Sequence, residues 1–169
     1  MRDNIAAIVF TSNTGFTRRY AELLSERTGL PFYDLKASAG PARGTPIVYL
    51  GWLCAGKLKG LKSAVKRWSV QAVCAVGLGT DEMNRVERLA PSLGYRPGPN
   101  LFYLRGGYAP EKVTGVMKLI MGMMRKAMQD KPPVDEEGKV MLEAFVNGGD
   151  WVDEARLDGV VAYLNGCDT

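Results

Sequence analysis

The residues best suited to chemistry lie between positions 11 and 17, where an apolar run gives way to hydroxyl-bearing residues and one glycine. The segment reads Thr11-Ser12-Asn13-Thr14-Gly15-Phe16-Thr17, and residues with helical spacing follow it. Its hydroxyls can donate hydrogen bonds, and the glycine lets the backbone approach a ligand closely. A helix that begins here would add free backbone N–H groups and the positive end of its dipole. These features predict a site for an ionised phosphate.

The segment lacks one feature that triphosphate sites of the P-loop type need. Their signature carries a lysine followed by Ser or Thr after the second glycine. Here Phe16, Thr17 and Arg18 stand in that place, so a monophosphate is favoured over a triphosphate with magnesium. A simpler interpretation stays open, in which Thr14 only caps the following helix.

A resemblance to a known family rests on the same residues. Residues 12–17 directly follow a hydrophobic run near the N-terminus, and this arrangement resembles the (T/S)-x-T-G-x-T loop of the flavodoxins. In that family the loop binds the phosphate of FMN. The resemblance therefore implies a flavodoxin-like fold with FMN as its cofactor.

A second candidate loop follows the apolar residues 47–50 and reads Gly51-Trp52-Leu53-Cys54-Ala55-Gly56-Lys57. Glycines on both sides of an aromatic residue, at the carboxyl end of a central strand, suit a ligand loop. The alternative is a tight strand-to-helix turn with a half-exposed Trp. Residues 53–57 are similar to the second half of the G-S-x-I-Y-A-G-K loop in flavodoxin-like proteins of the protoporphyrinogen oxidase type. The segment is one residue shorter here, and Cys54 replaces the family's Tyr, so Trp52 is the candidate for stacking on a flavin ring.

A third candidate loop, Gly77-Leu78-Gly79-Thr80-Asp81, follows the apolar run 70–76. Its glycines admit a close ligand, and Thr80 or Asp81 can cap the next helix. The resemblance implies that this is the second loop around the flavin ring.

Five strands must position these loops. Three of them are nearly all apolar, as strands buried on both faces of a parallel sheet are. The predicted strands are residues 5–10, 31–35, 47–50, 70–76 and 101–107. Right-handed crossovers between them predict an α/β fold with a five-stranded parallel sheet. With the resemblance, this implies a flavodoxin-like doubly wound sheet in the order 2-1-3-4-5.

Apolar residues at helical spacing predict the helices between the strands. They are expected from the first loop to Thr28, over 58–68, over 83–93 before Gly94, and over 151–164 with Asp150 as N-cap. Residues 96–99 predict a turn. Residues 36–46 are rich in Ala, Gly, Ser and Pro, so a helix there is short or missing.

Residues 108–149 exceed what a minimal flavodoxin needs, and we interpret them as an inserted helical segment in a single domain spanning 1–169. On a wheel of about 100° per residue, residues 112–128 divide into an apolar half and a basic half. The apolar half holds Val113, Val116, Met117, Ile120, Met121, Met123, Met124 and Met128; the basic half holds Lys112, Lys118, Arg125 and Lys126. This segment also resembles the insertion of the protoporphyrinogen oxidase subgroup. Such a helix suits packing against the protein, a lid over an apolar substrate with carboxylates, or peripheral contact with an anionic membrane.

Composition narrows the classes of function. With 169 residues, of which 46% are hydrophobic and 24% charged, the chain has the make-up of an ordinary globular protein. Its apolar runs fall short of the roughly 20 residues that span a bilayer, and the N-terminus lacks signal-peptide architecture, so a cytoplasmic location is expected. The chain has three cysteines, Cys54, Cys74 and Cys167, and no histidine, which argues against zinc, a cluster held by this chain alone and a histidine base.

Charge and motifs point to the partners. A net charge of +4 favours anionic partners, yet nucleic-acid-binding motifs are missing. Two functions stay open, both with FMN. The first is a redox protein that exchanges electrons with a partner protein or a small-molecule donor or acceptor. The second is an enzyme that oxidises a substrate such as protoporphyrinogen and passes the electrons to a quinone-type acceptor. A flavodoxin-like domain that has lost FMN is a third hypothesis.

Overall fold

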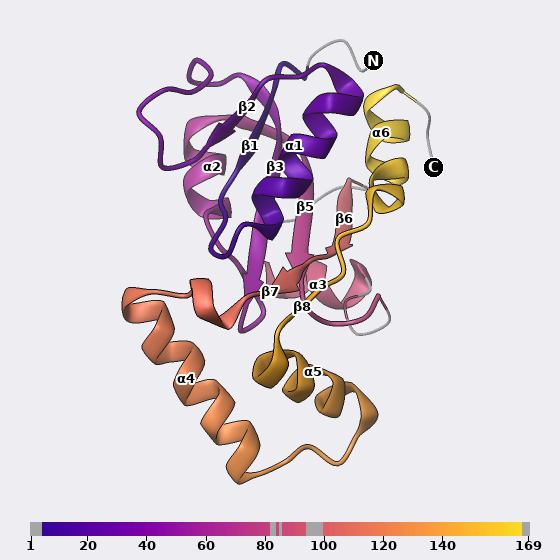
Figure 1. Ribbon diagram of the computed structural model, residues 1–169. Helices are drawn as coiled ribbons and strands as arrows, with labels where there is room; N and C mark the ends of the chain where they lie inside the picture. Colours follow the sequence, from indigo (N-terminus) through magenta and orange to yellow (C-terminus); the bar gives the residue numbers. More distant parts are fainter. Residues whose placement is uncertain (1–4, 82–83, 85, 94–99, 167–169) are drawn as a thin grey trace.

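The apolar runs of the sequence form one central sheet. We describe the computed structural model over residues 5–81, 84, 86–93 and 100–166 (Figure 1). Five strands lie parallel to their neighbours in the order β2-β1-β3-β5-β6. They are β1 (Ala7–Phe10), β2 (Phe32–Asp34), β3 (Pro46–Cys54), β5 (Ser69–Gly77) and β6 (Leu101–Arg105). The α/β class and the predicted order of the parallel strands are confirmed.

The sheet has six strands rather than five. The additional strand, β4 (Lys57–Leu58), pairs antiparallel with the end of β3. It follows a two-residue turn in which both Ala55 and Gly56 have positive φ, 49° and 72°. Such turns match the twist of a β-hairpin. The segment 51–54, predicted as a loop, is therefore part of β3.

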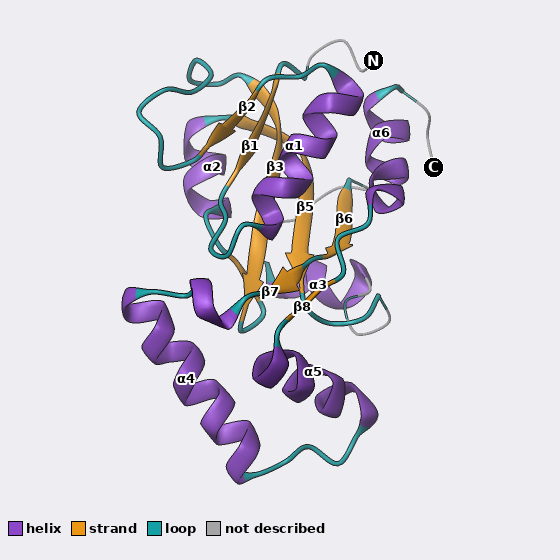
Figure 2. Cartoon of the chain, in the orientation of Figure 1, coloured by secondary structure: helices purple, strands orange, loops and turns teal. Residues whose placement is uncertain are grey.

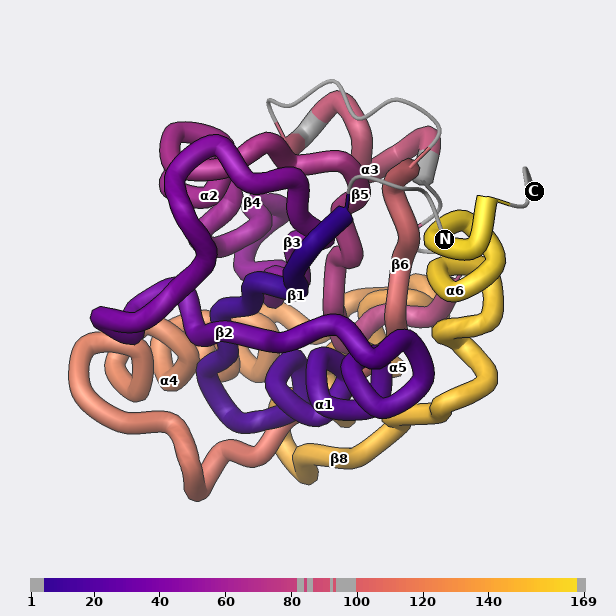
Figure 3. Tube along the Cα trace, turned by 90° about the horizontal axis from the view of Figure 1, so that it is seen from above, coloured from indigo at the N-terminus to yellow at the C-terminus, as the bar shows by residue number. Residues whose placement is uncertain are grey.

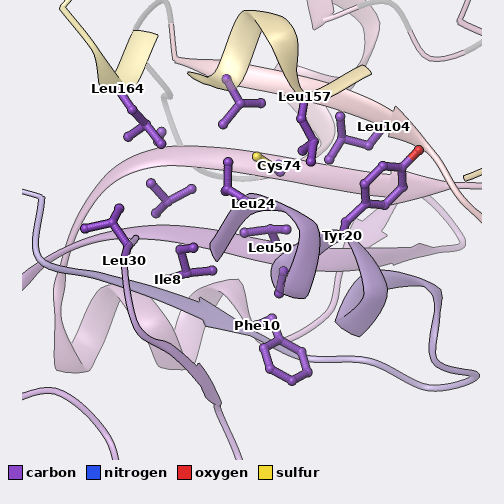
Figure 4. Close-up of a cluster of buried hydrophobic side chains, with 14 of the residues drawn as sticks. Ile8, Phe10, Tyr20, Leu24, Leu30, Leu50, Cys74, Leu104, Leu157 and Leu164 are labelled. Carbon is purple, nitrogen blue, oxygen red and sulfur yellow. The ribbon is translucent and has the colours of Figure 1, made fainter. Parts of the chain in front are cut away.

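Helices cover both faces of the sheet (Figure 2). They are α1 (Phe16–Thr28), α2 (Leu61–Arg67), α3 (Val86–Ser92) and α6 (Asp158–Leu164). Helices α1 and α6 pack on one face, with Ile8, Phe10 and Leu50 beneath them (Figure 4). Helices α2 and α3 pack on the other face, against Val9 and Tyr49. Figure 3 shows α1 on one side of the sheet and α2 and α3 on the other. Because successive residues of a strand point to opposite faces, a strand buried on both sides must be apolar throughout.

Several predicted boundaries are wrong. The predicted helix 58–68 is shortened to α2, because β4 and Gly60, with φ of 82°, precede it. The predicted helix 151–164 has a 3-10 helix at Glu154–Leu157 and becomes α-helical only at Asp158. Asp153 caps the 3-10 helix by accepting a hydrogen bond from the Ala155 N–H, whereas Asp150, the predicted cap, lies in strand β8. Met83, Gly94, the turn at 96–99 and Cys167 lie outside the described residues.

The inserted segment is closed at its base by two short strands. Strands β7 (Gly107–Tyr108) and β8 (Gly149–Asp150) pair antiparallel. Between them lie a 3-10 helix at Pro110–Lys112, helix α4 (Gly115–Asp130) and helix α5 (Glu136–Asn147). The predicted helix 112–128 is thus observed as α4, whereas α5 was not predicted. Figures 1 and 2 show both helices below the carboxyl ends of β3 and β5. None of the described helices is long and apolar enough to cross a membrane.

Candidate functional site

The three predicted loops meet at the carboxyl edge of the parallel strands. One cavity of about 40 Å³ is lined by residues from all three loops and from the insertion. Its walls are Ser12, Asn13, Thr14, Phe16, Thr17, Trp52, Leu53, Val76, Gly77, Leu78, Gly107, Tyr108 and Met121. From β1 the chain continues to β2 on one side and later to β3 on the other, so the strand order reverses between β1 and β3. Ligands of open α/β sheets bind at such a reversal.

The first loop leaves the start of helix α1 uncapped. Gly15 occupies the N-cap position with φ of 102°, and α1 has no side-chain cap within the described chain. Thr14 is therefore not the helix cap that the simpler interpretation required. The Ser12 hydroxyl oxygen accepts a hydrogen bond of 3.2 Å from the Gly15 N–H. The first intrahelical hydrogen bond runs from the Arg19 N–H to the Gly15 carbonyl, so among the described residues the N–H groups of 16–18 have no acceptor.

Thr17 and Thr11 are the two buried polar side chains of the described chain, and they have different surroundings. Thr17 lines the cavity, and within the described residues its hydroxyl has no hydrogen-bond partner. Thr11 is not among the cavity's wall residues, and its methyl group lies toward Gly60. Its N–H donates to the Leu50 carbonyl oxygen at 3.0 Å, which ties the loop to β3. Thr17 is thus placed to contact a ligand, whereas Thr11 supports the backbone.

Gly51 and Trp52 also have different roles. A Cβ atom at Gly51 would lie 2.8 Å from the Lys59 carbonyl oxygen and 2.9 Å from Leu58 Cγ. The approach of the β4 strand therefore requires this glycine, which does not line the cavities around the loops. Trp52 does line the first cavity, and it packs against a cluster formed mainly by the insertion. Lys59 Nζ lies 5.8 Å from the centre of the Trp52 ring.

A second cavity, of about 260 Å³, adjoins the first and shares Leu53, Gly77, Leu78 and Met121 with it. The remaining wall residues are Cys54, Ala55, Gly56, Gly79, Asn84, Leu89, Met124, Met128, Met141 and Phe145. Both ring loops predicted from the sequence therefore meet here, opposite the apolar sides of α4 and α5. The wall has no charged residue among the described positions, so the chamber suits an apolar planar group.

Hydrogen bonds from β6 hold the third loop in place. The Tyr103 hydroxyl donates to the Gly79 carbonyl oxygen at 2.6 Å, and the Arg105 guanidinium donates to the Leu78 carbonyl oxygen at 3.4 Å. Arg156 pairs with Asp81 at 2.5 Å. Burial raises the pKa of Tyr103, so this phenol stays protonated and can donate. The ion pair between Arg156 and Asp81 anchors the end of the loop.

Among the described residues, the walls of the two cavities carry no Asp, Glu, Lys or Arg side chain. The described part of the chain contains no cluster of three or more His, Cys, Asp or Glu side chains that could hold a metal ion. Burial raises the pKa of Cys74, so its thiol is unreactive in the core. Cys54 lines the second cavity and is half-buried.

The insertion supplies most of the wall residues that were missed in the sequence. Met141 and Phe145 had no recognisable signal, because α5 was not predicted, and Tyr108 lies in the short strand β7, which was not predicted either. Met121, Met124 and Met128 belong to the apolar half of the predicted helix, and their spacing was the signal that could have placed them at the site. In comparisons with known proteins, no family model matches the chain and no curated protein is significantly similar to it.

Proposed function

We propose that this is a flavodoxin-like redox protein that binds FMN and transfers electrons. The observation that carries the proposal is the two-part cavity at the edge of the sheet. An uncapped helix start, with the partnerless hydroxyl of Thr17 among the described residues, stands at one end, and an apolar chamber stands at the other. A flavin mononucleotide has the same division, because a dianionic phosphate is joined through a sugar alcohol to an apolar tricyclic ring.

The residues present fit the two ends of FMN. Ser12, Thr14, Thr17 and the N–H groups of 16–18 would hold the phosphate. Trp52, Leu53 and Leu78 would contact the ring, together with the glycine backbone of 77–79. When bound, FMN would supply one- and two-electron transfer, and the apolar wall would shield the ring from water. The parallel strand order also supports a flavodoxin-like fold, in which FMN binds at the β1/β3 switch point.

Binding requires the narrow first cavity to widen. The first cavity has a volume of about 40 Å³ and the second cavity about 260 Å³. Each is smaller than a typical ligand pocket, which has about 300–1,000 Å³. Tyr108 and Met121, which both come from the insertion, share the first cavity with the phosphate loop. Met121 is unbranched and can change its rotamer at low cost. We therefore infer that the insertion adjusts when FMN enters.

Titration of the purified protein with FMN, riboflavin and FAD tests the cofactor. The flavin absorbance spectrum of the protein as isolated and flavin fluorescence during titration are the readouts. We expect tight binding of FMN and much weaker binding of riboflavin, which lacks the phosphate. Equal affinity for FMN and riboflavin, or no binding of any flavin, would contradict the proposal and favour a domain that has lost FMN.

The chamber also supports a second function, in which the protein is an FMN-dependent enzyme. Its wall of Met121, Met124, Met128 and Met141 offers a deformable apolar surface for a bulky substrate. Basic residues of α4 would suit the carboxylates of a substrate such as protoporphyrinogen, and a quinone-type molecule would accept the electrons. Anaerobic assay of the FMN-loaded protein with protoporphyrinogen and a quinone separates the two functions. Turnover supports the enzyme, whereas exchange of electrons without turnover supports the carrier.

A further inference from the structure

Helix α4 has two apolar faces, and the protein covers only one of them. Met117, Met121, Met124 and Met128 pack into the cluster beneath the sheet, with Met121 buried. At about 100° per residue these four side chains fall within an arc of about 60°. They account for the packing of α4 against the rest of the chain.

The second apolar face points outward. It consists of Val116, Leu119, Ile120 and Met123, of which Val116, Leu119 and Met123 are 74%, 66% and 65% exposed. These residues fall within a separate arc of about 100° on the helix. Scattered exposed apolar residues need no explanation, but four on one face of one helix form a patch that marks an interaction site. We call these four residues the outer face of α4.

Basic residues border the outer face. Lys118 and Lys126 stand beside Leu119 and Met123 around a shallow depression that includes Gly115 and Gly122. The sequence from 112 to 128 contains Lys112, Lys118, Arg125 and Lys126 and no Asp or Glu. The surface that meets the outer face must therefore be apolar at its centre and negatively charged beside it.

We propose that the outer face of α4 binds the interface of an anionic lipid bilayer. A helix of this kind lies in the plane of the interface, with its apolar side chains among the acyl chains and its lysines reaching the headgroup phosphates. Helix α4 has 16 residues, which suits lying on a membrane and not crossing it, and Figures 1 and 2 show it at the edge of the molecule remote from α2 and α6. The proposal does not depend on FMN.

A second copy of the chain is a poorer occupant. Two outer faces in contact would bring their lysine borders together, and residues 112–128 contain no Asp or Glu to offset them. An anionic bilayer instead supplies negative charge over the whole border and accepts side chains of different shapes. Lipid is therefore a better partner for the flexible Leu and Met side chains of the outer face than a copy of the same helix.

Flotation of the full-length protein with lipid vesicles tests the proposal. One set of vesicles is pure phosphatidylcholine, and the other contains phosphatidylglycerol at about one third of the lipid. We expect binding to the anionic vesicles that weakens with added salt, and little binding to the neutral ones. L119S/M123S should abolish binding, and K118Q/K126Q should weaken it about fivefold for each lysine removed.

Matched variants on α2 control for changes in charge and hydrophobicity. K62Q/K66Q removes the same charge from an exposed helix, and V65S removes a half-exposed apolar side chain there. Both variants should bind vesicles like the parent protein. Equal loss in the α2 and α4 variants, or no binding to anionic vesicles, would overturn the proposal. It would also be overturned if sedimentation showed a dimer that L119S/M123S dissociates, since the outer face would then bind a second copy.

Discussion

The hydroxyl of Tyr103 donates a 2.6 Å hydrogen bond to the backbone carbonyl oxygen of Gly79. This bond joins β6 to the loop whose Gly77 and Leu78 stand in the walls of both cavities. A Cβ atom at Gly77 would lie 3.0 Å from the Tyr103 ring, so the ring also packs directly under the loop. The backbone of 77–79, which lines the cavities, is therefore positioned by a residue that lies outside both cavity walls.

The variant Tyr103→Phe should loosen this loop while leaving the ring packing intact. Loss of one hydrogen bond to a buried carbonyl should lower the free energy of unfolding by about 1 kcal/mol, measured by urea denaturation. FMN should also bind less tightly, because the loop must be ordered on binding. Tyr163→Phe is the matched control, since the Tyr163 hydroxyl donates to the Gln71 carbonyl oxygen, outside both cavity walls. An equal loss of FMN affinity in both variants would argue against a positioning role for Tyr103.

Thr17→Val should separate ligand binding from stability. Thr17 lines the first cavity and its hydroxyl has no partner among the described residues, so its removal should leave the free energy of unfolding nearly unchanged. Affinity for FMN should fall by about 1.5–3 kcal/mol, because a hydrogen bond to an ionised phosphate is lost.

Thr28→Val provides the control at the other end of the same helix. Its hydroxyl donates to the Leu24 carbonyl oxygen at 2.6 Å, so this variant should lose stability and keep its affinity for FMN. If Thr17→Val loses stability without losing affinity, the Thr17 hydroxyl has a structural role and the phosphate lies elsewhere.

Trp52 is expected to quench flavin fluorescence, because an electron-rich indole ring in contact with an excited flavin can donate an electron to it. Trp52→Phe should therefore bind FMN with brighter fluorescence at saturation. Trp151→Phe is the control variant, because Trp151 lies outside both cavity walls. Its ring centre lies 4.5 Å from Arg105 Cζ. Unchanged fluorescence in Trp52→Phe would assign ring contact to another residue, with Leu78 and Cys54 as the next candidates.

Alanine substitutions at Gly107 and at Gly122 should change the free energy of unfolding in opposite directions. A Cβ atom at Gly107 would lie 2.5 Å from the Gly149 carbonyl oxygen and 2.4 Å from Phe16 Cε1. Gly107→Ala should therefore lower stability by about 1–3 kcal/mol and weaken FMN binding through the displaced Phe16. Gly122 lies inside α4 with nothing within 4 Å of a new Cβ atom, so Gly122→Ala should raise stability by about 0.5–1 kcal/mol. Thermal and urea unfolding of the pair measure both effects.

Alkaline pH should destabilise the protein through its buried tyrosines. Burial raises the pKa of both Tyr49 and Tyr103 above the ordinary value of 10.0. Above about pH 10 the unfolded chain loses these protons while the folded chain retains them, so stability is highest below that pH and falls as pH rises. Urea denaturation between pH 8 and pH 11 should show this decline, and Tyr103→Phe should make it shallower. A stability that stays constant up to pH 11 would contradict the assignment.

The sequence was most informative where one physical requirement dominated. Val9 and its neighbours in β1 had to be apolar on both faces, and Gly15 had to stand where the chain turns into α1, so strand and loop could both be predicted. Gly51 was misleading, because a glycine that admits a neighbouring strand has the same signature as one that admits a ligand. A turn near Ala55 was expected, but the hairpin it forms between β3 and β4 was missed, since a residue with positive φ at that place is usually glycine or asparagine.

The insertion was the least predictable part of the site. Its position depends on contacts between residues far apart in the chain, such as the edge-on packing of the Tyr108 and Phe145 rings, whose centres are 5.5 Å apart. The period of the methionines predicted a helix, but it could not say which of two apolar arcs would face the protein. Asp150 was likewise predicted from its neighbours in sequence, as the N-cap of the last helix. Its carboxylate instead forms an ion pair with Arg19, far away in the chain, at an N–O distance of 2.6 Å.

The pairing of β7 with β8 makes the insertion an exchangeable module. Tyr108 lies opposite Gly149 and Gly107 opposite Asp150, so the chain enters and leaves the segment at adjacent points. The entropic cost of closing a loop grows only with the logarithm of its length, so segments of very different size can be accommodated between these two strands. The same base could therefore carry a two-residue turn or a foreign helical hairpin, and the binding surface could change in evolution or by grafting without altering the order of the sheet.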